Sequence, residues 1–327
     1  MRYLDVLLGQ LRATEWEWTP ETVYLGGGTP SQLAGDSLSS ILAAIPGREW
    51  AEATIEAAPG GLTAEKIAEW REAGINRVSL GVQSFVQKEL ARTGRRHTAE
   101  IVEQEIALLH AAGIKSISVD LIAGLPGQTE ASWAESLDWV ERLGVPHVSV
   151  YMLEVDEDSR LGRELLVLGS RYGAGDVPGE DAIADFYETA VERLARLGIE
   201  RYEISNFARP GFESRHNLKY WKREPYLGFG ADAHSFDGTM RWQNPESAAD
   251  YVAAPGAIER VAAEPVSESF FLGLRLREGI ASGGFADVVD RFVQDGLLER
   301  AGGRVRLTSR GVLLSNEVFA EFIQPAG

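Results

Sequence analysis

Residues Thr22 to Pro30 read Thr-Val-Tyr-Leu-Gly-Gly-Gly-Thr-Pro, a short apolar strand that runs directly into three glycines. This order places bare backbone, and then the hydroxyl of Thr29, at the carboxyl end of the predicted strand. Parallel α/β folds bind their ligands at that end of the sheet, and glycine there commonly lets a ligand approach the main chain. Three glycines alone are equally consistent with a tight turn, so the neighbouring strands must decide.

Four more apolar runs follow, with helical patterns between them. Near-continuous Val, Ile and Leu runs are typical of parallel strands that are covered on both faces, and strand–helix alternation predicts βαβ units in a barrel or a doubly wound sheet. The predicted strands are Val23–Leu25, Ala53–Ala57, Arg77–Val82, Ser116–Ile122 and His147–Leu153. The predicted helices are Met1–Ala13, Ser37–Ile45, Thr63–Ala73, Thr98–Ala112 and Glu130–Leu143. The alternation thus begins with a helix that no strand precedes.

The second half of the chain has a less regular pattern. An acidic, glycine-rich stretch, Glu154–Glu180, predicts a long loop, and a helix at Asp181–Leu197 and a strand at Arg201–Ile204 follow it. Residues 205–247 are rich in aromatic residues, Gly, Pro and Asn and predict irregular structure. The tail predicts a small helical domain, with an amphipathic helix at Phe285–Asp295 and a wing strand at Arg304–Thr308.

Composition narrows the classes of protein to consider. The chain has 327 residues, 44% of them apolar, and a net charge of −17. The acidic balance argues against a general nucleic-acid binder. No apolar run approaches the roughly 20 residues that span a bilayer, and no signal peptide is evident, so we expect a cytoplasmic protein. The sequence contains no cysteine, which excludes disulfides, thiolate metal sites and cysteine nucleophiles in the chain as written.

Polar side chains occur in or at the end of the strands that follow the first. Glu56, Gln83 and Asp120 each stand in an otherwise apolar segment. Each alone is as consistent with a hydrogen-bonded core residue as with a site, because an unpaired buried polar group costs a few kcal/mol. Together they converge on one mouth and favour a ligand with hydroxyls and an amine over a phosphate-rich one. Arg95 is placed to meet a carboxylate of such a ligand, or else is a surface residue.

Several motifs, in this order, closely resemble the HemW family, the haem-chaperone branch of the radical S-adenosylmethionine (SAM) proteins. The motifs are Gly-Gly-Gly-Thr-Pro-Ser (26–31), Ile-Glu-Ala-Ala-Pro (55–59), Ser-Leu-Gly-Val-Gln-Ser-Phe (79–85), Asp-Leu-Ile-Ala-Gly-Leu-Pro-Gly-Gln-Thr (120–129), Tyr-Glu-Ile-Ser-Asn-Phe-Ala (202–208), Arg-His-Asn-Leu-Lys-Tyr-Trp (215–221) and Tyr-Leu-Gly-Phe-Gly-Ala-Asp-Ala-His-Ser (226–235). The resemblance spans essentially the whole chain, and the joint occurrence of the motifs is highly specific.

The resemblance implies an α/β fold, a partial (β/α)6 barrel of the radical SAM type that here lacks its first strand, with a small C-terminal winged-helix-like domain. It implies a barrel at residues 1–200, an extension at 201–260 and the small domain at 261–327. The barrel mouth would bind SAM through residues at matching positions. These are Gly27, Gly28, Thr29, Glu56, Gln83, Arg95 and Asp120.

The resemblance also implies haem binding and delivery to apo-haemoproteins, some of them at membranes. Imidazole ligates haem iron and aromatic faces cover porphyrins. The aromatic region after the barrel offers His216, Asn217, Tyr220, Trp221 and His234 for this role. For the two histidines, hydrogen bonding that stiffens an irregular loop is an equal alternative.

The chain departs from the family at the [4Fe–4S] cluster, which needs three cysteines upstream of the first helix. That segment is absent from this sequence, so the cluster cannot form in the chain as written. Either the reading frame begins at an internal Met, which we favour, or this member has lost its cluster. A haem chaperone without turnover is the expected function. The alternative is an oxygen-independent coproporphyrinogen III oxidase. A barrel aldolase would need a strand-end Lys, and the predicted strands offer none.

Overall fold

The computed structural model describes residues 2–154, 171–256 and 259–323. Its main sheet has seven strands in the order β1-β2-β3-β4-β5-β7-β6. The first five pair in parallel and β7 and β6 add antiparallel strands. The strands are β1 Thr22–Leu25, β2 Glu52–Ala57, β3 Arg77–Gln83, β4 Ser116–Ala123, β5 His147–Met152, β6 Glu200–Arg201 and β7 Asn206–Ala208. The five predicted parallel strands are confirmed.

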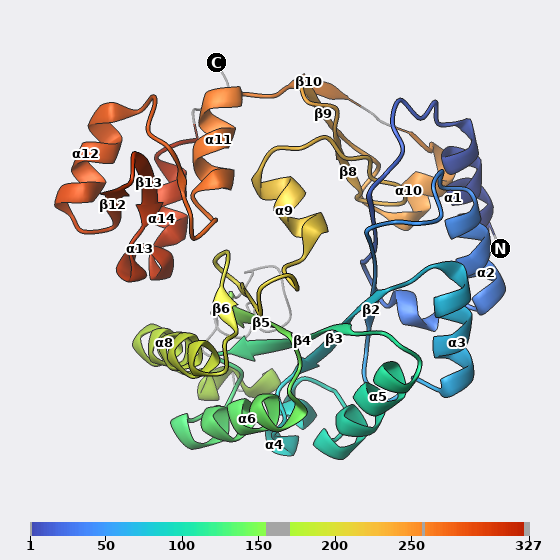
Figure 1. Cartoon of the computed structure of the whole chain (residues 1–327), viewed down its shortest axis with the longest axis horizontal. Coiled ribbons are helices and arrows are strands. Elements are labelled where there is room, and N and C mark those ends of the chain that lie inside the picture. Colours follow the sequence, from blue (N-terminus) through green and yellow to red (C-terminus); the bar gives the residue numbers. More distant parts are fainter. Residues whose placement is uncertain (1, 155–170, 257–258, 324–327) are drawn as a thin grey trace.

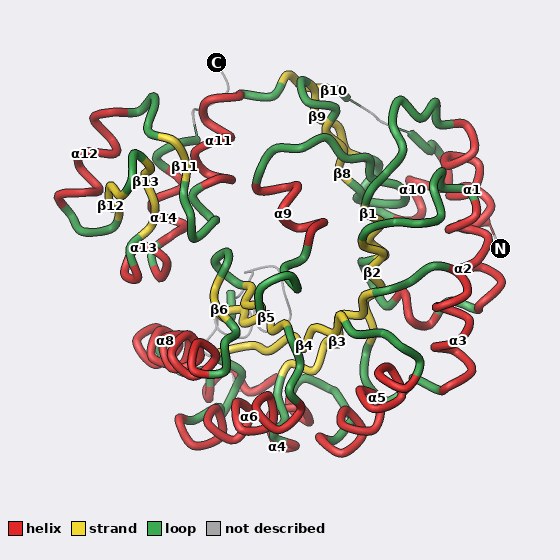
Figure 2. Tube along the Cα trace, in the orientation of Figure 1, coloured by secondary structure: helices red, strands yellow, loops and turns green. Residues whose placement is uncertain are grey.

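Helices cover the outer face of this sheet, and the sheet curves around the opposite, inner face (Figures 1 and 2). The helices are α1 Arg2–Ala13, α2 Gly35–Ala43, α3 Ala64–Ala73, α4 Gln87–Arg92, α5 Ala99–Ala111, α6 Glu130–Leu143 and α8 Glu180–Arg196, with a 3-10 turn η1 at Pro30–Gln32. Thr63 and Thr98 cap α3 and α5 by accepting a backbone N–H. α4 is a short helix of 6 residues between Gln83 and Arg95.

The hydrophobic core lies between the sheet and these helices. Alternate strand residues point toward it, as the period of two requires. Outward-facing strand residues in the core include Val23, Ala53, Ile55, Val78, Leu80, Ile117, Val119 and Val148. Trp70 on α3 and Trp133 on α6 are nearly inaccessible and fill it from the helix side. The barrel scaffold is therefore stabilised from its outer layer.

After β5, the structure differs from the sequence prediction in two segments: a predicted strand is mostly a turn, and a segment predicted to be irregular contains a helix and strands. Within the predicted strand Arg201–Ile204 only Arg201 is in a strand, because the Glu203 carboxylate accepts the N–H of Ser205 and turns the chain into β7. Residues 155–170 of the predicted loop lie outside the described residues, and Arg171–Asp176 forms a 3-10 turn, η2. The segment expected to be irregular contains α9 Arg215–Trp221, β8 His234–Phe236 and β9 Met240–Gln243.

The C-terminal part forms the small winged-helix-like domain that was expected. Its elements are α11 Pro265–Gly273, β11 Ile280–Ala281, α12 Ala286–Gln294, β12 Leu298–Ala301, β13 Arg304–Leu307, α13 Ser309–Leu313 and α14 Ser315–Ala320. Two elements precede this domain, α10 Ala248–Ala253 and β10 Arg260–Ala262. β13 lies between β11 and β12, while β10 joins β9 and β8. The predicted domain boundaries at residues 200 and 260 fall in β6 and β10 and stay predictions. None of the described helices is long and apolar enough to cross a membrane.

Candidate functional site

The inner face of the sheet is polar, because the residues that alternate with the core positions are mostly hydroxylated or charged. Hydrogen bonds join them across neighbouring strands, and α9 lies over this face (Figure 1). The inner residues are Thr22, Tyr24, Glu52, Thr54, Glu56, Arg77, Ser79, Ser118, Asp120, His147, Ser149 and Tyr151. The hydroxyls and carboxylates of this concave face are chemically suited to a polar ligand.

Asp120 occupies the centre of this face on β4. Its carboxylate lies 2.8 Å from Ser79 Oγ on β3, 3.0 Å from Ser118 Oγ and 2.7 Å from Ser149 Oγ on β5. Burial raises the pKa of Asp120, and the hydroxyls oppose that rise by donating to the ionised form. The charge of Glu56 raises it further, which places the two predicted carboxylates within reach of one another's field.

Glu56 holds the glycine turn that follows β1. The Tyr24 hydroxyl donates to Glu56 Oε1 at 2.6 Å, and the Gly27 N–H donates to Oε2 at 3.3 Å. Gly27 and Gly28 have positive φ values of 78° and 61°, and a Cβ on either would meet nothing within 4 Å. The glycines are thus required by backbone conformation, and the main chain there is open to a ligand.

Gln83 and Arg95 lie together at the end of β3. The β3–β4 register shifts between Leu80 and Gln83, and Gln83 takes a left-handed φ of 71°. Arg95 Nη1 donates to the Gly81 carbonyl at 2.8 Å. A Cβ on Gly81 would lie 3.4 Å from Gln83 Nε2 and 3.8 Å from Arg95 Nη2. Burial lowers the pKa of Arg95 while the charge of Asp120 raises it, so this pair faces the same mouth as Asp120.

His216 lies on α9 against the inner face of β1. Its Nδ1 is 2.8 Å from Thr22 Oγ1, its Nε2 is 2.7 Å from the Tyr220 hydroxyl, and its ring stacks on Tyr24 at 5.2 Å and 21°. Burial, and then the charge of Lys219, lower the pKa of His216 to about 4. The imidazole is therefore neutral at pH 7, which is the form that ligates metals.

The other predicted haem-region residues have different surroundings. The N–H of Asn217 donates to Ser214 Oγ, the N-cap of α9. The guanidinium of Arg275 lies 4.5 Å over the Trp221 ring, whose buried Nε1 has no hydrogen-bond partner within the described residues. His234 is exposed on β8, where it pairs with Gln243. The structure thus places His216, and not His234, on the barrel face.

Sequence reasoning missed several residues of the site. Thr22, Tyr24 and the serines around Asp120 were not selected, although their alternation with apolar residues in each strand was a usable signal. A second missed feature is a group of hydrogen-bonded polar side chains near the amino ends of β4 and β5. There His147 Nδ1 is 2.7 Å from Ser118 Oγ and His147 Nε2 is 3.0 Å from the Tyr202 hydroxyl. These contacts depend on a distant segment and left no local signal.

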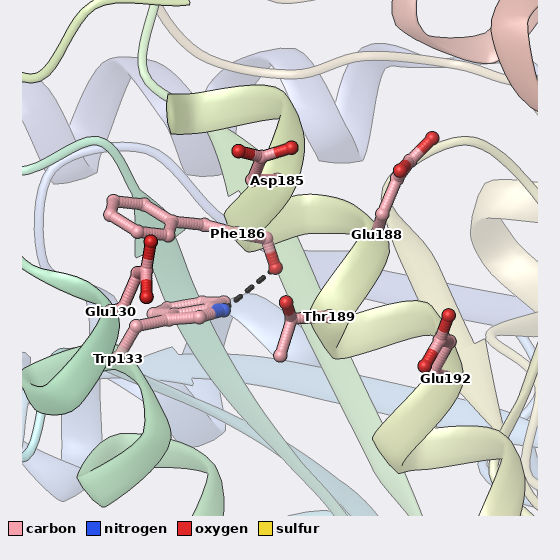
Figure 3. A pocket seen from close by; sticks show the side chains of 7 residues that line it. All are labelled: Glu130, Trp133, Asp185, Phe186, Glu188, Thr189 and Glu192. Atoms are coloured by element: carbon pink, nitrogen blue, oxygen red, sulfur yellow. Dashed lines mark hydrogen bonds between the residues drawn. The ribbon is translucent and has the colours of Figure 1, made fainter. Parts of the chain in front are cut away.

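A surface cavity of about 400 Å³ lies elsewhere, between α6 and α8. Figure 3 shows its lining, in which the Trp133 Nε1 donates to the Phe186 carbonyl at 2.7 Å. The lining residues are Glu130, Trp133, Asp185, Phe186, Glu188, Thr189 and Glu192. This cavity is on the helix side of the sheet, contains none of the predicted site residues and explains none of their arrangement.

Comparison with known proteins identifies the family. Residues 2–140 match the Radical SAM superfamily and residues 262–314 match the HemN C-terminal domain. "Heme chaperone HemW" of Lactococcus lactis is 34% identical over 98% of this chain and 89% of that protein. The chain belongs to the HemW family. HemW of Bacillus subtilis is 35% identical over 93% of this chain and 85% of that protein.

The fold of this HemW-family chain is also that of a solved structure. The coproporphyrinogen III oxidase HemN of Escherichia coli superposes with a TM-score of 0.81, covering 98% of this chain and 82% of the oxidase, at 20% identity. At that identity the likeness concerns the fold alone. It agrees with the partial barrel and C-terminal domain described above.

The residues present fit the two cofactors of the radical SAM family differently. An open glycine turn, carboxylates and an amide are suited to the amine and hydroxyls of SAM. A [4Fe–4S] cluster is held by cysteine thiolates, and this chain has none. Among the described residues there is also no group of three His, Asp or Glu placed to hold a metal ion. The cluster therefore does not fit this chain.

Proposed function

We propose that this protein binds haem and passes it to apo-haemoproteins, with His216 as the iron ligand. The observation that carries the proposal is the state of His216: a neutral imidazole, surrounded by aromatic rings, in a member of the HemW family. A hydrogen bond from Nδ1–H to Thr22 would fix the tautomer and leave the Nε2 lone pair for iron, as partners of metal-bound histidines commonly do. Tyr220 would give up Nε2 when haem binds.

We further propose that the mouth of the barrel binds SAM through Gly27, Gly28, Thr29, Glu56, Gln83, Arg95 and Asp120. SAM supplies a carboxylate, an amine and ribose hydroxyls for recognition, and a sulfonium as its reactive group. Arg95 is suited to the carboxylate, while Glu56 and the open backbone of Gly27 suit the amine and a hydroxyl. Thr29 makes no side-chain capping bond to the turn that follows it, which leaves its hydroxyl for the ligand. Tyr151, 44% exposed at the end of β5, offers an aromatic face beside them.

Haem titration of the purified protein, monitored at the Soret band, tests the haem proposal. Wild type and His234→Ala are expected to give the same band, while His216→Ala abolishes or shifts it. An unchanged spectrum for His216→Ala removes that residue as ligand. A parallel assay with coproporphyrinogen distinguishes the alternative function: haem uptake without turnover supports the chaperone, and turnover supports an oxidase.

A further inference from the structure

We infer that Tyr24 couples the strand-end site to the haem ligand, because one side chain both donates to Glu56 and stacks on His216. The inference rests on the proposed function for its consequence, and it assigns to Tyr24 a positioning role. Occupancy at Glu56 would change how firmly His216 is held. By linkage, haem at His216 would change the affinity for a ligand at Glu56 by the same factor.

The Tyr24 ring is also fixed by packing against Gly26. A Cβ on Gly26 would lie only 2.7 Å from Tyr24 Cε1 and 3.2 Å from Glu56 Oε1, so the ring fills the space that Gly26 leaves open. Burial, followed by the nearby charge of Glu56, raises the pKa of Tyr24 far above its ordinary value. The hydroxyl therefore keeps its proton and always donates to the carboxylate.

His216 is enclosed by groups that depend on the same strand. Thr22 and Tyr24 lie on one face of β1 because they are two residues apart. Thr22 bonds Nδ1 and Tyr24 covers one face of the ring, while Tyr220 bonds Nε2. Iron can reach Nε2 only after the Tyr220 hydroxyl withdraws, and the stack on Tyr24 holds the imidazole where Nε2 faces that hydroxyl.

The sign of the coupling follows from competition for Glu56. Hydrogen bonds to a carboxylate are about twice as strong as those between neutral groups. The bond to Glu56 therefore fixes the Tyr24 ring against His216 and favours the state in which Tyr24, Thr22 and Tyr220 enclose the imidazole. A ribose hydroxyl or amine that engages Glu56 Oε1 competes with Tyr24 for that acceptor. The ring then loosens and His216 is released to iron. SAM is expected to raise haem affinity by roughly fivefold, the lower end of common allosteric couplings.

Nitrogen NMR of histidine-labelled protein tests the coupling without haem. The sequence has five histidines, and the His216→Ala variant identifies the resonances of His216. Glu56→Gln and Tyr24→Phe should each shift these resonances, and the effect of Glu56→Gln should vanish in the Tyr24→Phe background. Tyr251→Phe is the matched control, because it removes a phenol hydrogen bond of the same 2.6 Å length, to Gln10 Oε1. His216 resonances that are unchanged in both site variants would overturn the inference.

Haem titration with and without SAM tests the consequence. Tyr24→Phe keeps the ring and should bind haem roughly fivefold more tightly than wild type, with no further response to SAM. Tyr251→Phe should retain the wild-type response. If His216→Ala loses haem while wild type ignores SAM, or Tyr24→Phe stays within twofold of wild type, the coupling is wrong. If His216→Ala keeps its Soret band, the proposed ligand is wrong, and the NMR measurement alone decides the coupling.

Discussion

Glu52 Oε1 accepts the backbone N–H of His216 at 3.0 Å. Glu52 opens β2 and is 5% exposed. Its Oε2 accepts the N–H of Arg215 at 2.9 Å, and Ser214 Oγ donates to Oε1 at 3.2 Å. A buried carboxylate from the barrel thus satisfies the amino end of α9, where backbone N–H groups lack helical partners. The position of the haem-ligand candidate is set by a residue 164 positions away in the sequence.

Replacing Glu52 with Ala should strongly destabilise the protein. The substitution leaves three donors at the start of α9 without their partner, and each unsatisfied buried donor costs about 1–3 kcal/mol. We expect a loss of roughly 3 kcal/mol in the free energy of unfolding, measured by urea denaturation. Glu213→Ala is the control, because Glu213 accepts only the solvent-exposed N–H of Gly211 and should change stability by less than about 0.5 kcal/mol. Equal effects of the two variants would refute this role.

The low pKa of His216 predicts a pH dependence of stability. The folded protein protonates His216 at about 4, whereas the unfolded chain does so near the ordinary value of 6.5. Above pH 6.5, His216 therefore does not reduce the free energy of unfolding. As pH falls from 6.5 toward 4, the unfolded chain binds a proton more readily than the folded protein, and the free energy of unfolding decreases. The difference between the two pKa values corresponds to roughly 3 kcal/mol in the free energy of unfolding. Because the ring is partly exposed, solvent screening reduces the expected change to about 2 kcal/mol.

Urea denaturation at several pH values measures this dependence. His147, whose pKa burial also lowers, contributes in the same direction, so the informative quantity is the slope that His216→Gln removes. A His216→Gln variant with the wild-type slope between pH 6.5 and 4 would contradict the assignment. Haem binding by the wild type should, for the same reason, weaken little between pH 8 and about 5.

Alanine substitutions should change the stability of the protein in opposite directions at a glycine with a left-handed backbone and at a glycine inside a helix. Gly28→Ala forces an L residue into a φ of 61° with no steric contact to relieve, and should cost about 1 kcal/mol. Gly9 lies inside α1 and its Cβ would also meet nothing within 4 Å. Gly9→Ala should therefore stabilise the protein by about 0.5–1 kcal/mol. Thermal melts of both variants check this, and a stabilising Gly28→Ala would show that the turn is not held as described.

Gln83 should show a conflict between stability and ligand binding. Its left-handed φ of 71° costs a non-glycine residue about 1 kcal/mol or more. Gln83→Gly is expected to keep or raise the melting temperature while it lowers SAM affinity in equilibrium dialysis. Gln83→Asn is the comparison, because it retains an amide and tolerates this φ better than most residues. If Gln83→Gly binds SAM as wild type does, the amide has no part in the site.

The sequence predicted the barrel well because its signals are local. The five apolar strand segments and the helical patterns between them each depend on a few consecutive residues. The expected convergence of Glu56, Gln83 and Asp120 followed from the parallel strands in which they lie. The charge of Asp120 interacts with Glu56 and with Arg95, and Gln83 and Arg95 both lie beside Gly81. Their role in binding SAM stays a prediction.

What the sequence could not predict depends on long-range contacts. Nothing near Thr22 indicates that it will bond a histidine 194 positions later, and nothing in 205–221 indicates that Glu52 will cap the helix there. The strand predicted at Arg201–Ile204 was wrong beyond Arg201. There the Glu203 side chain accepts a hydrogen bond from the Ser205 N–H, and this bond competes with the backbone hydrogen bonds of a strand. Propensity does not include such competition.

The division of the sheet into an apolar outer side and a hydroxyl-rich inner side bears on how such proteins diversify. Free energy of folding comes chiefly from the outer layer, where Ile55, Leu80 and Val119 are inaccessible. Exchanges on the concave wall, such as Ser for Thr or Tyr for Phe, leave that layer intact. Descendants of one ancestral scaffold can therefore acquire new ligands by changing wall residues other than those that anchor α9, such as Glu52, while the outer layer keeps them folded.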